Sequence, residues 1–252
     1  VTQLSATQIT ALTTDQLNAM EQADVEKLTT SQVAALKADQ VGGLSTTQLS
    51  RLSTAQVNAL SGAHISRLST DSVKSLSSAQ VAAINVTALR SLTADQINAL
   101  DTVDLAAMGT AQVAALTPGQ VAGVSVTQVA SLNTASVAAL TSTQAQALTS
   151  AQVAGLTTTQ IGALETADLS AMSSAQLAGL SVTQIGKLST AQVAALTTGQ
   201  VAGLSATQVA SLSSAATAAL TTSQVQALTT AQVQGPSATQ LNSLTTAQMA
   251  SM

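Results

Sequence analysis

An apolar residue recurs every eight positions along the chain, from Leu4 through Leu12 and onward to Leu244 and Met252. Each octad is numbered 1 to 8 from this residue. Position 1 is Leu in 25 of the 31 complete octads, and position 6 is Val, Ile, Leu or Met in 29. Position 2 is Ser or Thr in 24 octads and position 5 is Gln in 23. The octad 188–195, LSTAQVAA, is typical, and no insertion interrupts the series.

A period of eight excludes one continuous α-helix. At about 100° per residue, eight residues overshoot two turns by roughly 80°, so an apolar stripe would drift around the helix. The pattern Ser/Thr-x-x-Gln at positions 2 to 5 is instead a capping box at a helix N-terminus. Positions 1 and 6 are then the two residues of a hydrophobic staple. The pattern predicts a short helix from position 3 to about position 8 of each octad.

Other residues agree with this register. Pro118 is at position 3, the first helical residue, where a missing N–H costs nothing. Ten of the eleven acidic residues are at positions 2, 4 or 5, and six of the seven basic residues are at positions 7 or 8. This segregation complements the helix dipole. Nine of the 13 glycines are at positions 7 or 8, which indicates left-handed C-terminal caps and close approach of neighbouring chain segments.

The predicted fold is therefore all-α: a solenoid of short helices, one per octad, with a thin Leu/Val core. The alternative is a β-solenoid, which Val, Thr and Ser would suit. However, positions 1 and 6 have opposite parity, so they cannot share one face of a strand. We expect positions 2, 3 and 5 to lie outward or to line the turns, and two octads to complete one turn of the coil.

A single octad cannot be stable alone, because its helix is far shorter than the ~12 residues at which isolated helices become marginal. Stability should therefore grow with the number of stacked octads. We expect residues 1–252 to form a single solenoid that is part of a longer array. Open ends of such an array are self-complementary, which favours association of copies end to end or side by side.

Composition narrows the function. The chain has no aromatic residue and no Cys, 7% charged residues and a net charge of −4. Disulfides and Cys-based metal sites are excluded. Without a basic patch or rings that stack on bases, nucleic acid is not an expected partner. Without an apolar run of 18 residues, membrane insertion is not expected either.

Catalytic chemistry is not indicated. His64 is the only His, and it replaces Gln at position 5 of its octad, so we expect a polar substitute in the capping box. No second His or Cys completes a zinc site, and no base accompanies the abundant Ser residues. We expect a protein that is not an enzyme and that has no catalytic, cofactor-binding or metal-binding residues.

Acidic pairs at positions 2 and 5 recur in three octads: Glu21/Asp24, Asp101/Asp104 and Glu165/Asp168. We interpret them as charged versions of the cap. The alternative is a weak cation site, since Ca²⁺ prefers oxygen ligands. Rows of Ser and Thr at positions 2 and 3 are interpreted as caps and solvated surface, with O-glycosylation or recognition of sugars or ice as alternatives.

The units LTTAQVAAL, LSTAQVNAL and LTTTQIGAL resemble the Ala/Thr/Gln-rich octapeptide arrays of large secreted or surface adhesin-like proteins of Gram-negative bacteria. The resemblance covers the whole chain and implies an extracellular or cell-surface location. The expected function is a structural spacer or a self-assembling fibre or filament subunit. The alternative is an adhesin-type binding module that recognises a glycan, ice or a partner protein through a regular Ser/Thr/Gln surface.

Overall fold

The structure is a computed structural model that describes residues 3–252. It divides into two units, unit 1 up to Leu132 and unit 2 from Asn133 to Met252. Within the described residues there are 31 short helices, one per octad, and no strand. The predicted all-α solenoid of short helices is confirmed in each unit, and the β-solenoid is wrong. That residues 1–252 form a single solenoid stays a prediction.

The helices of unit 1 are α1 (Ala6–Ala11), α2 (Thr14–Asn18), α3 (Gln22–Glu26), α4 (Thr30–Ala35), α5 (Ala38–Gly42), α6 (Thr46–Arg51), α7 (Thr54–Asn58), α8 (Gly62–Ile65), α9 (Thr70–Lys74), α10 (Ser78–Ala83), α11 (Val86–Leu89), α12 (Ala94–Ala99), α13 (Thr102–Ala107), α14 (Thr110–Ala115), α15 (Pro118–Gly123) and α16 (Val126–Ser131). The helices of unit 2 are α17 (Thr134–Ala138), α18 (Ser142–Ala147), α19 (Ser150–Gly155), α20 (Thr158–Ala163), α21 (Thr166–Ala171), α22 (Ser174–Ala178), α23 (Val182–Ile185), α24 (Thr190–Ala195), α25 (Thr198–Ala202), α26 (Ala206–Ala210), α27 (Ser214–Ala218), α28 (Thr222–Gln226), α29 (Thr230–Gln234), α30 (Ala238–Asn242) and α31 (Thr246–Ala250).

Helix boundaries follow the capping box. In α24, the N-cap Ser189 has φ −71° and ψ 163°, and its hydroxyl accepts a hydrogen bond from the backbone N–H of Gln192. The Gln192 side chain accepts in turn from the N-cap N–H, which completes the capping box. The chain leaves the helix at Leu196, which is extended at φ −62° and ψ 144°. Each octad thus consists of a short helix and an extended corner at positions 1 and 2.

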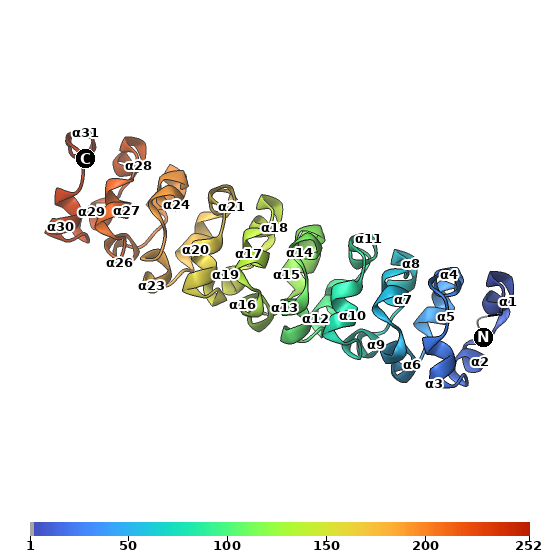
Figure 1. The fold of residues 1–252 in the computed structure, drawn as a ribbon. Helices are drawn as coiled ribbons and strands as arrows, with labels where there is room; N and C mark the ends of the chain where they lie inside the picture. Colours follow the sequence, from blue (N-terminus) through green and yellow to red (C-terminus); the bar gives the residue numbers. More distant parts are fainter. Residues whose placement is uncertain (1–2) are drawn as a thin grey trace. The chain divides into compact units, whose positions relative to one another are not determined.

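Three octads, and not two, complete one turn of the coil. Helices that pack closely within a unit are three apart in sequence, such as α5 with α8 in unit 1 and α24 with α27 in unit 2 (Figure 1). One turn is therefore 24 residues. The expectation of two octads was wrong because it considered only two opposed apolar faces. With three octads, each corner turns the chain by about a third of a revolution, and positions 1 and 6 all face inward.

The core is the predicted pair of apolar positions. Position 6 residues such as Val33 and Ile161 are fully buried, and position 1 residues such as Leu60 and Leu164 are nearly so. A second expectation was wrong, because position 5 is buried as well: Gln192 is only 3% exposed. Its amide needs hydrogen-bond partners that lie inside the coil, on the preceding turn.

Glycines serve close packing between turns. No described residue has a positive φ, so left-handed caps at positions 7 and 8 were a wrong expectation. A Cβ added at Gly42 would lie 2.7 Å from the carbonyl oxygen of Arg67, and one at Gly123 would lie 2.5 Å from the Cβ of Ala94. Small residues at these positions therefore let neighbouring turns approach, as the sequence also predicted.

Candidate functional site

The feature that repeats most regularly inside both units is a hydrogen-bonded link made by the position-5 glutamine. The Gln192 Oε1 accepts from the Ser189 N–H at 2.9 Å. Its Nε2 donates to the carbonyl oxygens of Leu164 at 2.8 Å and Ile161 at 3.0 Å. We call this arrangement the glutamine link. One buried side chain closes the N-terminus of α24 and also donates to two carbonyl groups at the C-terminal end of α20.

In the described glutamine links Nε2 donates to the carbonyl oxygen 28 residues earlier, and in nearly all of them also to a second carbonyl oxygen 30 or 31 residues earlier. In unit 1, Gln56 donates to Leu28 and Val25, which are 28 and 31 residues earlier. In unit 2, Gln200 donates to the carbonyl oxygens of Met172 and Leu169 at the same separations. Each turn is therefore bonded to the preceding one through three such positions. The glutamine is a structural group whose two N–H donors are both used.

His64 reproduces this link with an imidazole. Its Nδ1 is 3.1 Å from the Ser61 nitrogen and its Nε2 is 2.7 Å from the Leu36 carbonyl oxygen. The Ser61 N–H can only donate and the carbonyl oxygen can only accept, so Nδ1 is the acceptor and Nε2 the donor of this link. The expectation that His64 substitutes for Gln in the cap is confirmed.

Asn85 provides the link from a different position, which the sequence did not reveal. Its octad has Ala88 at position 5. The Asn85 Oδ1 accepts from the Ala88 N–H, and its Nδ2 donates to the carbonyl oxygens of Asn58 and Leu60 at 2.9 and 2.8 Å. The signal was present, because the two Asn residues at position 2, Asn85 and Asn133, both occur where position 5 is not Gln.

In two of the acidic octads the position-5 side chain accepts a hydrogen bond from the preceding turn, whereas a glutamine donates to it. Asp104 and Asp168 are buried at position 5, at 4% and 3% exposure. The hydroxyl of Ser78 donates to Asp104 Oδ1 at 2.8 Å, and that of Ser142 donates to Asp168 Oδ1 at 2.9 Å. The serine lies 26 residues before the aspartate in both cases, on the preceding turn. The structure thus brings two of the three acidic pairs together with a hydroxyl that sequence reasoning missed.

Burial dominates the electrostatics of these carboxyls. It raises the pKa of both Asp104 and Asp168 above the usual value of an aspartate, although the serine hydrogen bonds oppose the shift. The neighbouring carboxylates Asp101 and Glu165 add to the increase. The Oδ2 of Asp168 is buried and has no hydrogen-bond partner among the described residues. The third pair is more open, since Glu21 is exposed and Asp24 is half-buried.

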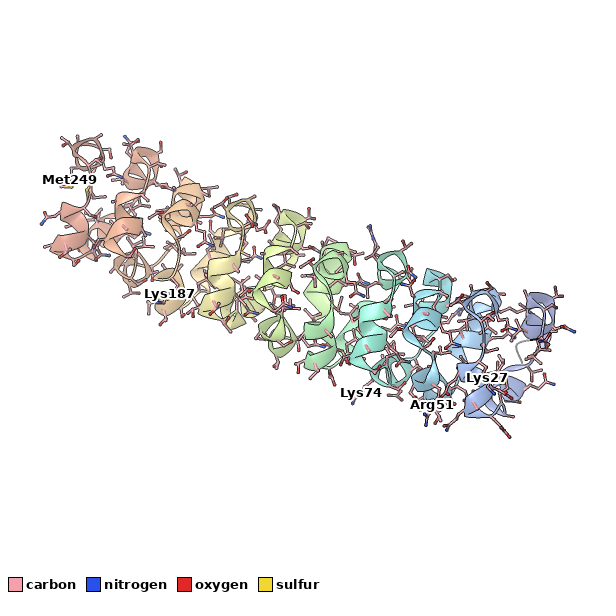
Figure 2. The ribbon with its side chains drawn as sticks, viewed as in Figure 1. Lys27, Arg51, Lys74, Lys187 and Met249 are labelled. Carbon is pink, nitrogen blue, oxygen red and sulfur yellow. The ribbon has the colours of Figure 1, made fainter. Side chains whose placement is uncertain are left out.

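Basic side chains form a row on the outside of unit 1. Lys27, Arg51 and Lys74 are spaced by about one turn and lie along one edge of the unit (Figure 2). The Arg51 guanidinium is 3.6 Å from the Glu26 carboxylate, in an ion pair whose two side chains are about half exposed. Exposed pairs of this kind contribute less than about 1 kcal/mol. The row is therefore a solvated surface feature.

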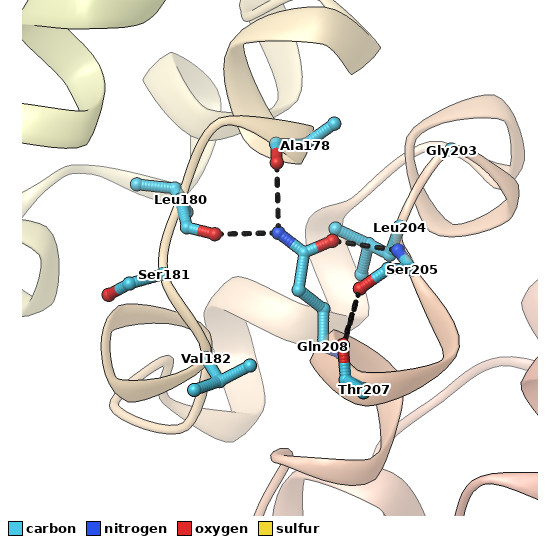
Figure 3. Close-up of a pocket in the computed structure, with 9 residues that line it drawn as sticks. All are labelled: Ala178, Leu180, Ser181, Val182, Gly203, Leu204, Ser205, Thr207 and Gln208. Atoms are coloured by element: carbon cyan, nitrogen blue, oxygen red, sulfur yellow. Dashed lines mark hydrogen bonds between the residues drawn. The ribbon is translucent and has the colours of Figure 1, made fainter.

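An open hollow of about 440 Å³ lies between two turns of unit 2 (Figure 3). Its lining includes the exposed Val182, the hydroxyls of Ser205 and Thr207, and the amide of Gln208. That amide donates to Ala178 and Leu180 in a glutamine link, and the two hydroxyls are 2.9 Å apart. Its polar groups therefore bond mainly to one another.

Across residues 3–252, no three His, Cys, Asp or Glu side chains converge in a way that could hold a metal ion. None of the described helices is long and apolar enough to cross a membrane.

Three stretches of the chain, residues 17–54, 161–198 and 197–230, match the model of the ALTTAQ repeat. These matches confirm an array of repeats, in agreement with the octads of the sequence. No curated protein matches the chain.

Proposed function

We propose that the chain is a structural repeat protein outside the cell, acting as a spacer or a self-assembling fibre subunit, and that it is not an enzyme. The observation that carries this proposal is the glutamine link, which repeats with the same register in both units. The extracellular location rests on the resemblance of the octads to surface-protein arrays.

The link suits a spacer because it makes every turn equivalent. Each octad caps its own helix and bonds to the turn before it, so octads can be added in multiples of three without disturbing their neighbours. A force along the coil axis would act on the buried hydrogen bonds and apolar contacts of each turn. The buried position 5 leaves mainly Ser, Thr and Ala outside, so the surface carries few groups suited to chemistry.

Self-assembly is proposed because the glutamine links use one register in both units, so that turns of a second copy can stack on the coil in the same way.

Sedimentation velocity and negative-stain electron microscopy of the purified chain test this proposal. We expect filaments at high concentration. Monomeric elongated particles at all concentrations would retain the spacer and reject the fibre. A frictional ratio typical of a sphere would reject both.

The alternative is a binding module with a regular hydroxyl surface. The 24-residue turn brings Thr30, Thr54, Ser78 and Thr102 into one row of unit 1, exposed or half-buried. The position-5 glutamines, which the sequence placed on this surface, do not contribute to it because they are buried. Glycan-array and ice-affinity assays with the isolated chain discriminate the alternatives, since a spacer should give no signal in either assay.

A further inference from the structure

The two buried acidic octads lack the donor that the rest of the coil uses. In a glutamine link, Nε2 fills the space between position 5 and the carbonyl oxygen 28 residues earlier, as for Gln192 and Leu164. The equivalent carbonyls for Asp168 and Asp104 belong to Leu140 and Leu76, in residues that are 6% and 5% exposed. No hydrogen bond from the described residues reaches either carbonyl oxygen.

The acidic octad of unit 2 therefore has acceptors without donors at the register where a glutamine link has its amide nitrogen. The Oδ2 of Asp168 is buried and unpartnered, while its Oδ1 accepts from Ser142. The carbonyl oxygen of Leu140 belongs to the same place in the repeat. Buried polar groups in folded proteins are nearly always paired with protein, water or an ion. A group that interacts favourably with several oxygens is required here.

The second acid of each pair is not needed for the helix. Glu165 makes no side-chain cap hydrogen bond, although Ser or Thr at this position does so in the neighbouring octads. Asp101 caps its helix through Oδ1, which accepts from Val103 and Asp104, and this leaves its Oδ2 without a described partner. Position 2 is acidic only where position 5 is Asp. The two carboxylates therefore occur as a set, although their charges repel each other.

We propose that the acidic octad of unit 2 binds a divalent cation of the Ca²⁺ type in place of the glutamine amide. The ligands are Asp168 Oδ2, the Glu165 carboxylate and the Leu140 carbonyl oxygen, and Ser142 orients Asp168 through Oδ1. Water completes the six to eight oxygens that Ca²⁺ takes. In unit 1 both oxygens of Asp104 already accept hydrogen bonds, from the Ser78 hydroxyl at 2.8 Å and from the Asp101 N–H at 3.4 Å, so no site is proposed there.

Charge and chemistry favour a cation over a lone water molecule. Two carboxylates and a carbonyl are hard oxygen ligands, and a divalent ion neutralises the pair. The bound ion would connect position 5, position 2 and the preceding turn, which are the groups that a glutamine link connects. Unit 2 has only one other charged side chain, Lys187, and that residue is outside the octad of Asp168. The octad therefore has no basic side chain that neutralises its two carboxylates. This inference does not depend on the proposed fibre or spacer role.

Isothermal titration calorimetry of the chelator-treated full chain with CaCl₂ tests the proposal. The paired variants E165T/D168Q and D101T/D104Q convert each acidic octad to the common one and should fold. We expect E165T/D168Q to remove the bound Ca²⁺ ion, and D101T/D104Q to leave it in place. The control D71N/D95N removes two exposed acids at position 4 and should leave the stoichiometry unchanged.

Thermal unfolding followed by circular dichroism gives a second readout. Ca²⁺ at millimolar concentration should raise the Tm of the wild-type chain by at least about 2 °C, and should not raise that of E165T/D168Q. Absence of Ca²⁺ binding at millimolar concentration would overturn the proposal and leave a proton or water at this site. Equal loss of binding in D71N/D95N would also overturn it, because the binding would then be diffuse.

Discussion

Replacement of Gln192 isolates the contribution of one glutamine link. Gln192→Ala leaves the buried carbonyl oxygen of Leu164 and the Ser189 N–H without their partner, and it removes one of two donors to the carbonyl oxygen of Ile161. Each buried group left unsatisfied costs about 1–3 kcal/mol, and water that enters the vacated space recovers part of it. We therefore expect the variant to lose about 2–4 kcal/mol of unfolding free energy.

Gln192→Glu is a sharper test because it keeps the shape. One carboxylate oxygen still accepts from Ser189, but the other faces two carbonyl oxygens at the positions where Nε2 was 2.8 and 3.0 Å away. Repulsion and burial should make this variant less stable than Gln192→Ala at neutral pH. Because the folded state raises the pKa of the new carboxyl, the deficit should shrink as the pH falls and the protonated group donates to one carbonyl.

Urea unfolding followed by far-UV circular dichroism measures both variants, since the chain has no Trp or Tyr. The matched controls are Gln226→Ala and Gln226→Glu, at an exposed position of the same unit that makes no described hydrogen bond. They should change stability by no more than about 0.5 kcal/mol. A loss below that size for Gln192→Ala, or equal effects of the two Glu variants, would refute the link.

Three further predictions concern other positions. His64→Gln should fold with wild-type stability, because either side chain supplies an acceptor and a donor. His64→Ala should lose about 2 kcal/mol of unfolding free energy, measured by urea unfolding. In metal-free buffer, Asp104→Gln with Asp168→Gln should stabilise the chain at neutral pH. That gain should diminish on acidification, because burial raises both aspartate pKa values and protonation below them stabilises the wild type; unfolding across a pH series checks this. Gly42→Ala should cost about 1–3 kcal/mol, since its Cβ meets the Arg67 carbonyl, whereas Gly119→Ala, with no atom within 4 Å, should stabilise by about 0.5–1 kcal/mol in thermal unfolding.

Local structure was predictable because the capping box is local. The hydroxyl of Ser189 and the amide of Gln192 are three residues apart, and both bonds that start α24 are encoded within one octad. The apolar residues at positions 1 and 6 were likewise correctly placed in the core. These features need no knowledge of how octads stack.

The coil period and the burial of Gln were not predictable from the octad alone. The partner of each glutamine Nε2 is 28 residues away, and a polar residue in an amphipathic pattern is ordinarily assigned to the outside. One signal was available: position 5 is never Glu, although a capping box accepts Glu as readily as Gln. The exclusion of Glu indicates that a donor is needed as well as an acceptor.

The surroundings of the acidic pairs also could not be predicted from the octad alone. Their two members were recognised at positions 2 and 5, but the serine that bonds each aspartate is 26 residues earlier and becomes a neighbour only in a three-octad turn. The role of Ser78 and Ser142 therefore depends on the coil period. With that period known, the same register assigns the carbonyls of Leu76 and Leu140 to the octads of Asp104 and Asp168.

Disulfide trapping tests the three-octad turn most directly, because the natural chain has no Cys. A Cβ at Gly203 would lie 3.1 Å from the Cβ of Ser174, close to the separation of about 3.5–4.5 Å found in disulfides. The account predicts that S174C/G203C forms an intramolecular disulfide readily on oxidation. It also predicts that S174C/A195C, which a two-octad turn would bring together, does not. The reverse result, with the bond in S174C/A195C alone, would contradict the account.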